Sequence, residues 1–389
     1  MAVTRLLLAA VLAAAIGVGG WYFFLRSSDD EHGIWVGALE DSVKQLDPAI
    51  ADRQVRLASE AGFDTLNLTT PWIPGQREPA EQELLVLRNV AAAAKHYRLR
   101  FMITIYHLRN RDTPDTNDEQ QQFAEYTATL ARDLPSVRFF IIGNEPNLNR
   151  FWLPQFDEAG RDVAAPSYTN LLARVYDSLK AVSPRIKVVG GSLSPRGDDN
   201  PESPRHTQSP TVFIRDMGRA YRASGRTKPI MDILAIHPYL ERSSLPPTRR
   251  HPGTSIGIAD YEKLVDLLGQ AFDGTKQPGS KLPIAYTEFG VQSRIPEAAQ
   301  GPYTNLQSPL GRDAVDESTQ AAYYRQALDL AVCQPTVVGL IFFHLVDEAD
   351  LNRWQSGPYY ADGRPKSSLD AIRDAAVKAR HGDLASCPD

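Results

Sequence analysis

The sequence lacks the signatures of several large protein classes. It has no basic stripe and a formal net charge of only −5, so we expect no nucleic acid as a partner. No glycine-rich phosphate loop follows the first strand-like segment, which argues against an open nucleotide-binding sheet. That segment ends in GALED, without the His-x-His motif of many metal-dependent hydrolases. What remains is an ordinary globular composition, with 42% hydrophobic and 23% charged residues.

Cysteine is scarce, since Cys333 and Cys387 are the only two in 389 residues. In an oxidising compartment they would form a disulfide that ties the C-terminal tail to a late helix; the alternative is two unrelated thiols. No cysteine lies near the N-terminal apolar run, which argues against a lipoprotein.

The N-terminus carries the longest uncharged run of the chain, from Leu6 to Leu25. Its length is close to a bilayer's thickness, and it ends in the aromatic cluster 21–24, which suits a membrane interface. We predict a membrane anchor in residues 1–31, with a cleaved signal peptide as the alternative. Either way, residues 32–389 form an extracytoplasmic catalytic domain, membrane-anchored or secreted, for which a monomer is the favoured state.

Strand-like and helix-like segments alternate through the rest of the chain. Eight strands are predicted at 34–40, 63–70, 99–107, 138–145, 186–193, 231–239, 282–289 and 337–345. Eight helices are predicted near 49–61, 80–97, 118–133, 168–182, 211–223, 259–272, 318–333 and 367–380. The clearest helix has an apolar stripe over 168–182, with Ser167 as its expected N-cap. Strict alternation predicts parallel strands, and eight units predict a closed (β/α)₈ barrel, an α/β fold also called a TIM barrel.

The connections that follow the predicted strands are longer than those that precede them. Three of them, 194–210, 240–257 and 291–316, are rich in proline, glycine and serine. Loops of this length in a compact domain are commonly functional. All three leave the carboxyl ends of strands, so we expect them to surround one face of the barrel, where such folds build their active sites.

Two glutamates lie at the ends of apolar runs. Glu145 follows the fourth strand in RFFIIGNEPN, and Glu288 ends the seventh in AYTEFG. Cleavage of a glycosidic bond requires two carboxyl groups, one to protonate the leaving oxygen and one to attack the anomeric carbon or activate water. One of the two glutamates must then stay protonated near neutral pH, while the other must stay charged and needs hydrogen-bond donors.

The GNEP and TEFG motifs resemble clan A of the glycoside hydrolases, a group of TIM-barrel retaining glycosidases that includes families 39 and 5. The resemblance spans roughly residues 33–380 and implies that Glu145 is the acid/base and Glu288 the nucleophile. It also implies that Asn144 binds the sugar 2-hydroxyl, that Tyr239 in HPY donates to Glu288, and that His237 lines the same subsite. The implied substrate is a β-linked sugar or its α-L-arabino equivalent, and the implied chemistry needs no metal or other cofactor.

Further substrate contacts are predicted at strand ends and in the following loops. The candidates are His107, Trp72, Trp152 and His344, with Asp41, Asp347 and Glu348 as rivals for which the sequence favours salt-bridged or solvated roles. Many clan members end strand eight with a tryptophan that forms the floor of the cleavage subsite. Here the segment reads LIFFHLVDE, so Phe343 or His344 would take that place.

Two other functions fit the same residues. The ring formed by His107, His237, His344 and the two glutamates is compatible with a divalent metal for amide or ester hydrolysis. A non-catalytic, exported sugar-binding barrel is also compatible with this sequence. The predicted function is a retaining glycoside hydrolase acting, by endo cleavage, on an extracellular oligosaccharide or polysaccharide.

Overall fold

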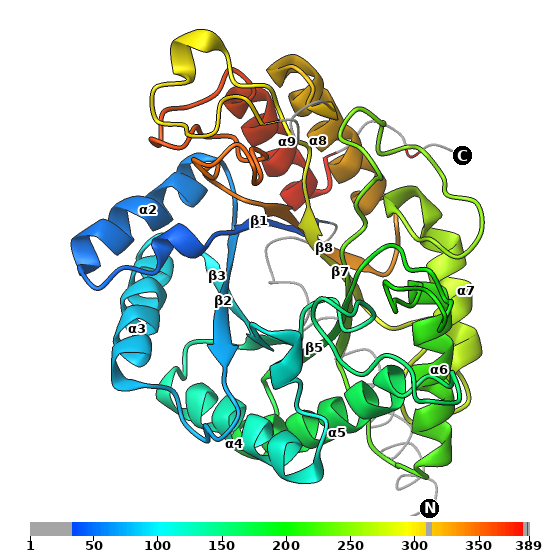
Figure 1. Cartoon of the computed structure of the whole chain (residues 1–389). Helices are drawn as coiled ribbons and strands as arrows, with labels where there is room; N and C mark the ends of the chain where they lie inside the picture. The colour runs from blue at the N-terminus through cyan, green and yellow to red at the C-terminus, as the bar shows by residue number, and fades with distance from the viewer. Residues whose placement is uncertain (1–32, 309–312, 384–386, 388–389) are drawn as a thin grey trace, which may run out of the picture.

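The computed structural model describes residues 33–308, 313–383 and 387, and within them a closed barrel of eight parallel strands (Figure 1). Neighbouring strands pair in chain order, and β8 returns to pair with β1, for example Trp35 with Gly339. The strands are β1 (Trp35–Leu39), β2 (Thr65–Trp72), β3 (Arg100–His107), β4 (Phe139–Ile142), β5 (Lys187–Leu193), β6 (Ile233–Ile236), β7 (Ile284–Phe289) and β8 (Val337–Phe343). The predicted (β/α)₈ fold is therefore confirmed.

A ring of helices surrounds the barrel, as Figure 1 shows. They are α2 (Pro48–Glu60), α3 (Glu81–His96), α4 (Asn117–Asp133), α5 (Ala164–Val182), α6 (Pro210–Ala223), α7 (Tyr261–Phe272), α8 (Glu317–Val332) and α9 (Leu369–His381). The expectation that Ser167 caps α5 is wrong. The helix begins at Ala164, and the Asp162 side chain accepts a hydrogen bond from the Ala165 N–H at 3.1 Å, so a carboxylate upstream satisfies the first turn.

Two apolar layers hold the barrel together. The larger layer lies between the strands and the helices and includes the buried stripe of α5, such as Leu172 and Leu179. The smaller one comprises Trp35, Met102, Ile141, Val189, Ile233, Ala235 and Ala285. Because its members come from strands and from no helix, it fills the barrel interior, as expected for this fold.

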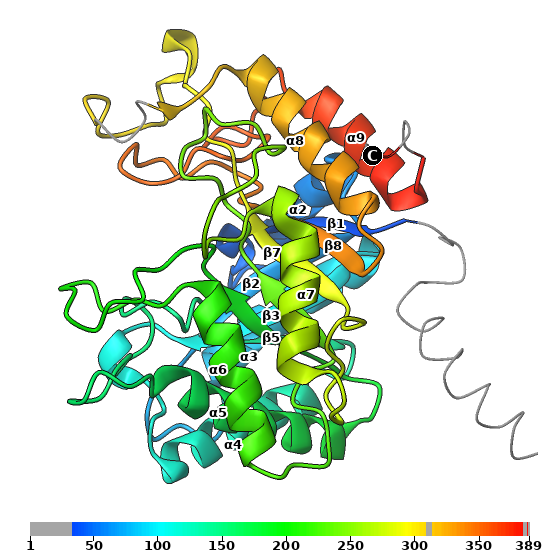
Figure 2. The same cartoon turned by 90° about the vertical axis from the view of Figure 1, so that its right-hand side faces the viewer.

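The long connections after the strands gather at one end of the barrel (Figure 2). At the far end of the chain, Cys333 and Cys387 form a disulfide with a Cα–Cα distance of 5.5 Å, which confirms the pairing. The predicted membrane anchor lies outside the described residues. Within the described ranges, no helix combines the length and apolar character needed to cross a bilayer.

Candidate active site

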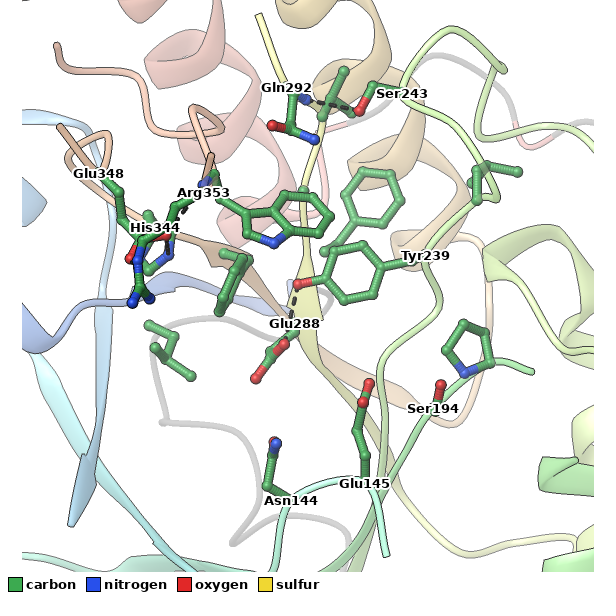
Figure 3. Close-up of a pocket in the computed structure, with 18 of the residues that line it drawn as sticks. Asn144, Glu145, Ser194, Tyr239, Ser243, Glu288, Gln292, His344, Glu348 and Arg353 are labelled. Carbon is green, nitrogen blue, oxygen red and sulfur yellow. Dashed lines mark hydrogen bonds and ion pairs between the residues drawn. The ribbon is translucent and has the colours of Figure 1, made fainter. Parts of the chain in front are cut away.

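A cavity of about 1080 Å³ opens among the loops that follow the strands. Five residues predicted from the sequence line it, namely Asn144, Glu145, Tyr239, Glu288 and His344. Figure 3 shows the Glu145 and Glu288 side chains facing each other in this cavity, with Tyr239 directed at Glu288. We refer to this cavity as the cleft.

The local backbone places each carboxylate at the mouth of the barrel. Glu288 is the next-to-last residue of β7, whereas Glu145 lies in the loop just beyond β4. Glu145 has a positive φ of 42°, a strained conformation for a side-chain-bearing residue. Its N–H donates to the Ser192 carbonyl at 2.9 Å, so β5 holds the strained turn in place.

His237 lies between the two carboxylates. Its Nδ1 atom is 3.2 Å from Glu145 Oε1 and 3.5 Å from Glu288 Oε2. Because both oxygens lie within these distances of one nitrogen, they are at most about 7 Å apart. This limit allows the separation of roughly 5 Å that is typical of retaining glycosidases. It excludes most of the larger separations found in inverting glycosidases.

The Tyr239 hydroxyl donates to Glu288 Oε2 at 3.0 Å, the hydrogen bond implied by the HPY motif. Burial nevertheless raises the pKa of Glu288; the Glu145 carboxylate adds to this rise, while His237 and Tyr239 oppose it. Burial thus outweighs these groups, and the pKa of Glu288 lies above its ordinary value of 4.5. Burial lowers the pKa of His237, but the two carboxylates raise it by a larger amount. The net shift of this pKa is therefore upward.

A buried carboxylate positions the opposite wall of the cleft. Glu40, just after β1, is 4% exposed and accepts hydrogen bonds from the N–H groups of Leu345 and Val346 at 3.0 and 2.9 Å. Consecutive N–H groups aimed at one carboxylate form an anion-binding concavity. Here it fixes the chain directly after His344, whose own φ is 90°. The imidazole Nε2 of His344 then lies 3.5 Å from the Glu348 carboxylate.

The tryptophan missing from the end of β8 is supplied by the loop that follows it. Trp354 lines the cleft together with Phe343, and their rings meet edge to face with centroids 5.4 Å apart. Trp354 also packs on Tyr239 at 5.3 Å. The sequence motif gave no sign of this contact, because it depends on how the loop after β8 folds back.

Four predicted substrate contacts do not line the cleft, namely His237, which is buried beside the two carboxylates, and three residues that lie elsewhere. Trp72 is fully buried against Phe123 of α4, and Trp152 is 1% exposed and packs on His107. His107 is buried too; its ring contacts the Phe151 carbonyl and Thr113, and burial lowers its pKa to about 4. Trp72 and His107 end strands, along which side chains alternate, and both turn away from the cleft, whereas Trp152 lies in the loop after β4 and packs into the core.

The neighbour of His107 lines the cleft, where His107 was expected to lie. Tyr106, one residue earlier on β3, points the other way and lines the cleft. Burial raises the pKa of Tyr106 to about 12. The prediction named the residue next to the one that lines the cleft. Only the alternation of side chains along β3 could have shown which of the two faces the cleft.

The three rival acids have different positions. Asp41 lines the cleft and is paired with Lys44 at 3.0 Å, and Glu348 lines it beside His344. Asp347 is fully buried in an ion pair with Lys366 at 2.7 Å, so it is a structural residue. In the part of the chain that the structure describes, no group of three or more histidine, cysteine, aspartate or glutamate side chains is arranged to hold a metal ion.

The barrel, with a carboxylate pair at its mouth, defines the class of architecture found in many glycosidases. Comparison with solved structures agrees. A GH5_18 enzyme from Streptomyces cattleya, solved with GlcNAc, has a TM-score of 0.56 at 16% identity, over 90% of this chain and 81% of that one. The GH39 enzyme from Xanthomonas axonopodis pv. citri has a TM-score of 0.54 at 13% identity, over 90% and 67%.

A protein described as beta-glucosidase 1317 is a third similar structure, with a TM-score of 0.58 at 15% identity over 90% of this chain and all of that one. No protein-family model and no curated protein matches the chain by sequence. At these identities the likeness establishes the fold. That fold is shared with GH5 and GH39 enzymes, in agreement with the resemblance carried by the two glutamate motifs.

Proposed function

We propose that this chain is a retaining glycoside hydrolase that cleaves β-type glycosidic bonds in an extracellular oligosaccharide or polysaccharide. The observation that carries the proposal is the pair of carboxylates at the barrel mouth, both within 3.5 Å of one histidine nitrogen. Two carboxyl groups at this separation can flank one glycosidic bond from opposite sides.

In this mechanism, Glu288 attacks the anomeric carbon while Glu145 gives its proton to the leaving oxygen. The C–O bond breaks, a covalent glycosyl–Glu288 ester forms, and the leaving sugar departs with the proton. Glu145, now ionised, removes a proton from water, and the water oxygen displaces Glu288. Two displacements restore the original anomeric configuration, and both carboxyl groups return to their starting states.

Neighbouring side chains support these roles. The Tyr239 hydroxyl stabilises the charged form of Glu288 and orients it, and Asn144 lies in the same cleft, where it would contact the sugar 2-hydroxyl. His237 contacts both carboxylates, and its raised pKa reflects their combined negative charge. A proton on its Nδ1 atom would hold the two carboxylates in place without joining either step.

The substrate proposal rests on the cleft and on analogy. A variant of the Streptomyces cattleya enzyme was crystallised with Manb1-4GlcNAc, and another similar structure is described as an exo-beta-1,4-mannosidase. By analogy we propose a β-linked sugar, or its α-L-arabino equivalent, as the substrate here. The size of the cleft, about 1080 Å³, suits several sugar units and favours endo action. Anchoring by residues 6–25 would place the enzyme outside the cytoplasm.

The decisive experiment is hydrolysis by Glu145→Gln and Glu288→Gln, with Glu262→Gln on the exposed face of α7 as the matched control. Each cleft variant should abolish turnover, whereas the control should retain it. Azide should rescue Glu288→Ala or Glu288→Gly by taking the place of the lost nucleophile. NMR of the first product formed by the unmodified enzyme should show retention of configuration.

Normal rates in both glutamine variants would end the assignment. A sugar-binding protein without activity would instead show no turnover in the unmodified chain, together with ligand affinity that survives both substitutions. Loss of activity on adding a chelator would favour the metal-dependent alternative, because the proposed chemistry uses only protein carboxylates.

A further inference from the structure

A buried histidine and aspartate form a rigid unit in the long connection between β6 and α7. The His251 Nδ1 atom lies 2.9 Å from Asp260 Oδ2, and Asp260 also accepts hydrogen bonds from the N–H groups of His251 and Gly257. His251 and Asp260 are 5% and 4% exposed. A Cβ on Gly257 would lie 2.5 Å from the His251 ring, so the loop can close around that ring only with glycine at this position.

The other side of the His251 ring faces the cleft. Its Nε2 atom is 3.1 Å from Glu241 Oε1, and the Glu241 side chain is 42% exposed and lines the cleft. Burial opposes ionisation of Glu241, but its own backbone N–H, His251 and Arg196 outweigh that effect and lower its pKa. Glu241 is therefore a charged carboxylate at the cleft surface, with the buried His251 ring 3.1 Å from its Oε1 atom.

A glutamate that only contacts solvent requires no buried histidine beside it. An unrestrained glutamate on a surface loop keeps its rotamer freedom, and fixing such a side chain costs up to about 2 kcal/mol of conformational entropy. Burying a histidine between two carboxylates adds a desolvation cost. A carboxylate with a buried ring 3.1 Å from one of its oxygens has fewer orientations open to it, so it loses less entropy when it hydrogen-bonds a ligand.

Glu241 lies on one definite side of the bond to be cleaved. In Figure 3, Ser194 lies on the side of Glu145 that is away from Glu288 and Asn144. Because Glu145 gives its proton to the leaving oxygen and Asn144 is the expected partner of the sugar attacked by Glu288, we take Ser194 and the loop after β5 as the side of the departing sugar. Arg196 belongs to that loop and is close enough to Glu241 to lower its pKa. Glu241 and Arg196 thus lie together on the leaving-group side.

We propose that Glu241, positioned by His251 and Asp260, binds the hydroxyl groups of the departing sugar. This inference rests on the proposed glycosidase function and defines its substrate class: the leaving group is itself a sugar with free hydroxyl groups. The carboxylate accepts hydrogen bonds from such hydroxyls, and the adjacent Arg196 guanidinium donates them. An aromatic leaving group without hydroxyls offers Glu241 nothing to bind.

The test compares two substrates that share the cleaved sugar and differ in the leaving group. The probes are the 4-nitrophenyl glycosides and the β-1,4-linked disaccharides of glucose, mannose and N-acetylglucosamine. Glu241→Gln should lower kcat/KM on the disaccharide by roughly tenfold to a hundredfold, the range for losing hydrogen bonds to a charged group. On the matching 4-nitrophenyl glycoside it should change kcat/KM by no more than about twofold. Glu262→Gln should leave both values unchanged.

The positioning role of His251 requires a double-mutant cycle. His251→Phe should impair the disaccharide reaction selectively, and adding it to Glu241→Gln should cause little further loss, because the two residues act through one carboxylate. Glu241→Asp keeps the charge but shortens the side chain, and should behave like Glu241→Gln even if the His251 variant fails to fold.

Three outcomes separate the hypotheses. An equal loss on both substrates, or no loss on the disaccharide, would overturn the inference while leaving the glycosidase assignment intact. Failure of the unmodified protein to hydrolyse these probes or any longer β-linked oligosaccharide would count against the glycosidase assignment and therefore against the inference as well. A selective loss on the disaccharide with unchanged thermal unfolding would support Glu241 as a sugar-binding residue.

Discussion

Replacing Tyr239 with phenylalanine removes one hydrogen bond and little else. The new phenylalanine ring would keep the contacts that Tyr239 makes with Trp354 and Phe343, with centroids 5.3 and 6.2 Å away, so the aromatic wall of the cleft should persist. What disappears is the hydroxyl that donates to Glu288 Oε2 at 3.0 Å. A hydrogen bond to a charged acceptor contributes about 1.5–3 kcal/mol, which corresponds to about a tenfold to hundredfold effect.

The sign of the effect follows from the protonation state that the bond favours. Burial already raises the pKa of Glu288, and the Tyr239 hydroxyl opposes this rise by stabilising the carboxylate. Attack requires the ionised form, so kcat/KM rises with pH through the pKa of Glu288 in the free enzyme. Tyr239→Phe removes the opposing contact, raises this pKa further and moves the acidic limb of the profile to higher pH. The loss is greatest below the limb and smaller on the plateau.

The assay is a pH profile of kcat/KM for Tyr239→Phe beside that of a matched control. Tyr303→Phe removes a similar buried hydrogen bond, to Asp347 Oδ2 at 2.8 Å, away from the residues that line the cleft. The control should lose stability without moving the acidic limb. An acidic limb in Tyr239→Phe that stays in place or moves to lower pH would refute the role assigned to Tyr239, and with it the identification of Glu288 as the ionised nucleophile.

Three further substitutions test the structure. Glu288 has a folded-state pKa above its ordinary value of 4.5, so its ionised form destabilises the fold at neutral pH; Glu288→Gln should raise the thermal midpoint at pH 7, with a gain that shrinks as the pH falls through 4.5. Lys366→Met leaves Asp347 buried without its cation and should lower the free energy of unfolding in urea by about 3–5 kcal/mol at pH 7. Burial already raises the pKa of Asp347 to about 6, so this loss should be smaller at pH 5, where the variant's carboxyl is neutral. Cys387→Ser opens a bridge that spans 54 positions and should cost roughly 2–4 kcal/mol in the same measurement, with kcat/KM unchanged.

The barrel could be predicted from the sequence because each of its elements is encoded locally. An unbroken apolar run such as Phe139–Ile142 indicates a buried strand, and the periodic apolar stripe of α5 indicates a helix. All eight strands and all eight helices appear within a few residues of their predicted positions. The residues at which helices and strands begin and end could be predicted less closely. Helix α5 starts earlier than its stripe because Asp162, a residue outside the periodic pattern, caps its first turn.

In the candidate site, too, the residues at strand ends could be predicted from the sequence, whereas a residue in a loop could not. Glu145, His237, Tyr239 and Glu288 meet because each lies at or just beyond the carboxyl end of a strand, and these ends converge in one barrel. Trp354 belongs to a loop whose path is set by tertiary contacts, such as the hydrogen bond from its N–H to Glu348 at 3.1 Å. No periodicity records such contacts, so the aromatic wall became visible only in the structure.

Strained backbone conformations are an independent indication of a functional site. Glu145, Ser192 and His344 all have positive φ values, 42°, 47° and 90°, and each lies at the carboxyl end of a strand or just beyond it. Such conformations cost about 1–3 kcal/mol each and persist only where surrounding contacts enforce them. Those contacts are present: Ser192 holds Glu145 through its carbonyl, and Glu40 holds the chain after His344. Because such contacts enforce the strained positions at the mouth, the stability of the apolar layers below is what allows this end of the barrel to keep two carboxyl groups facing each other.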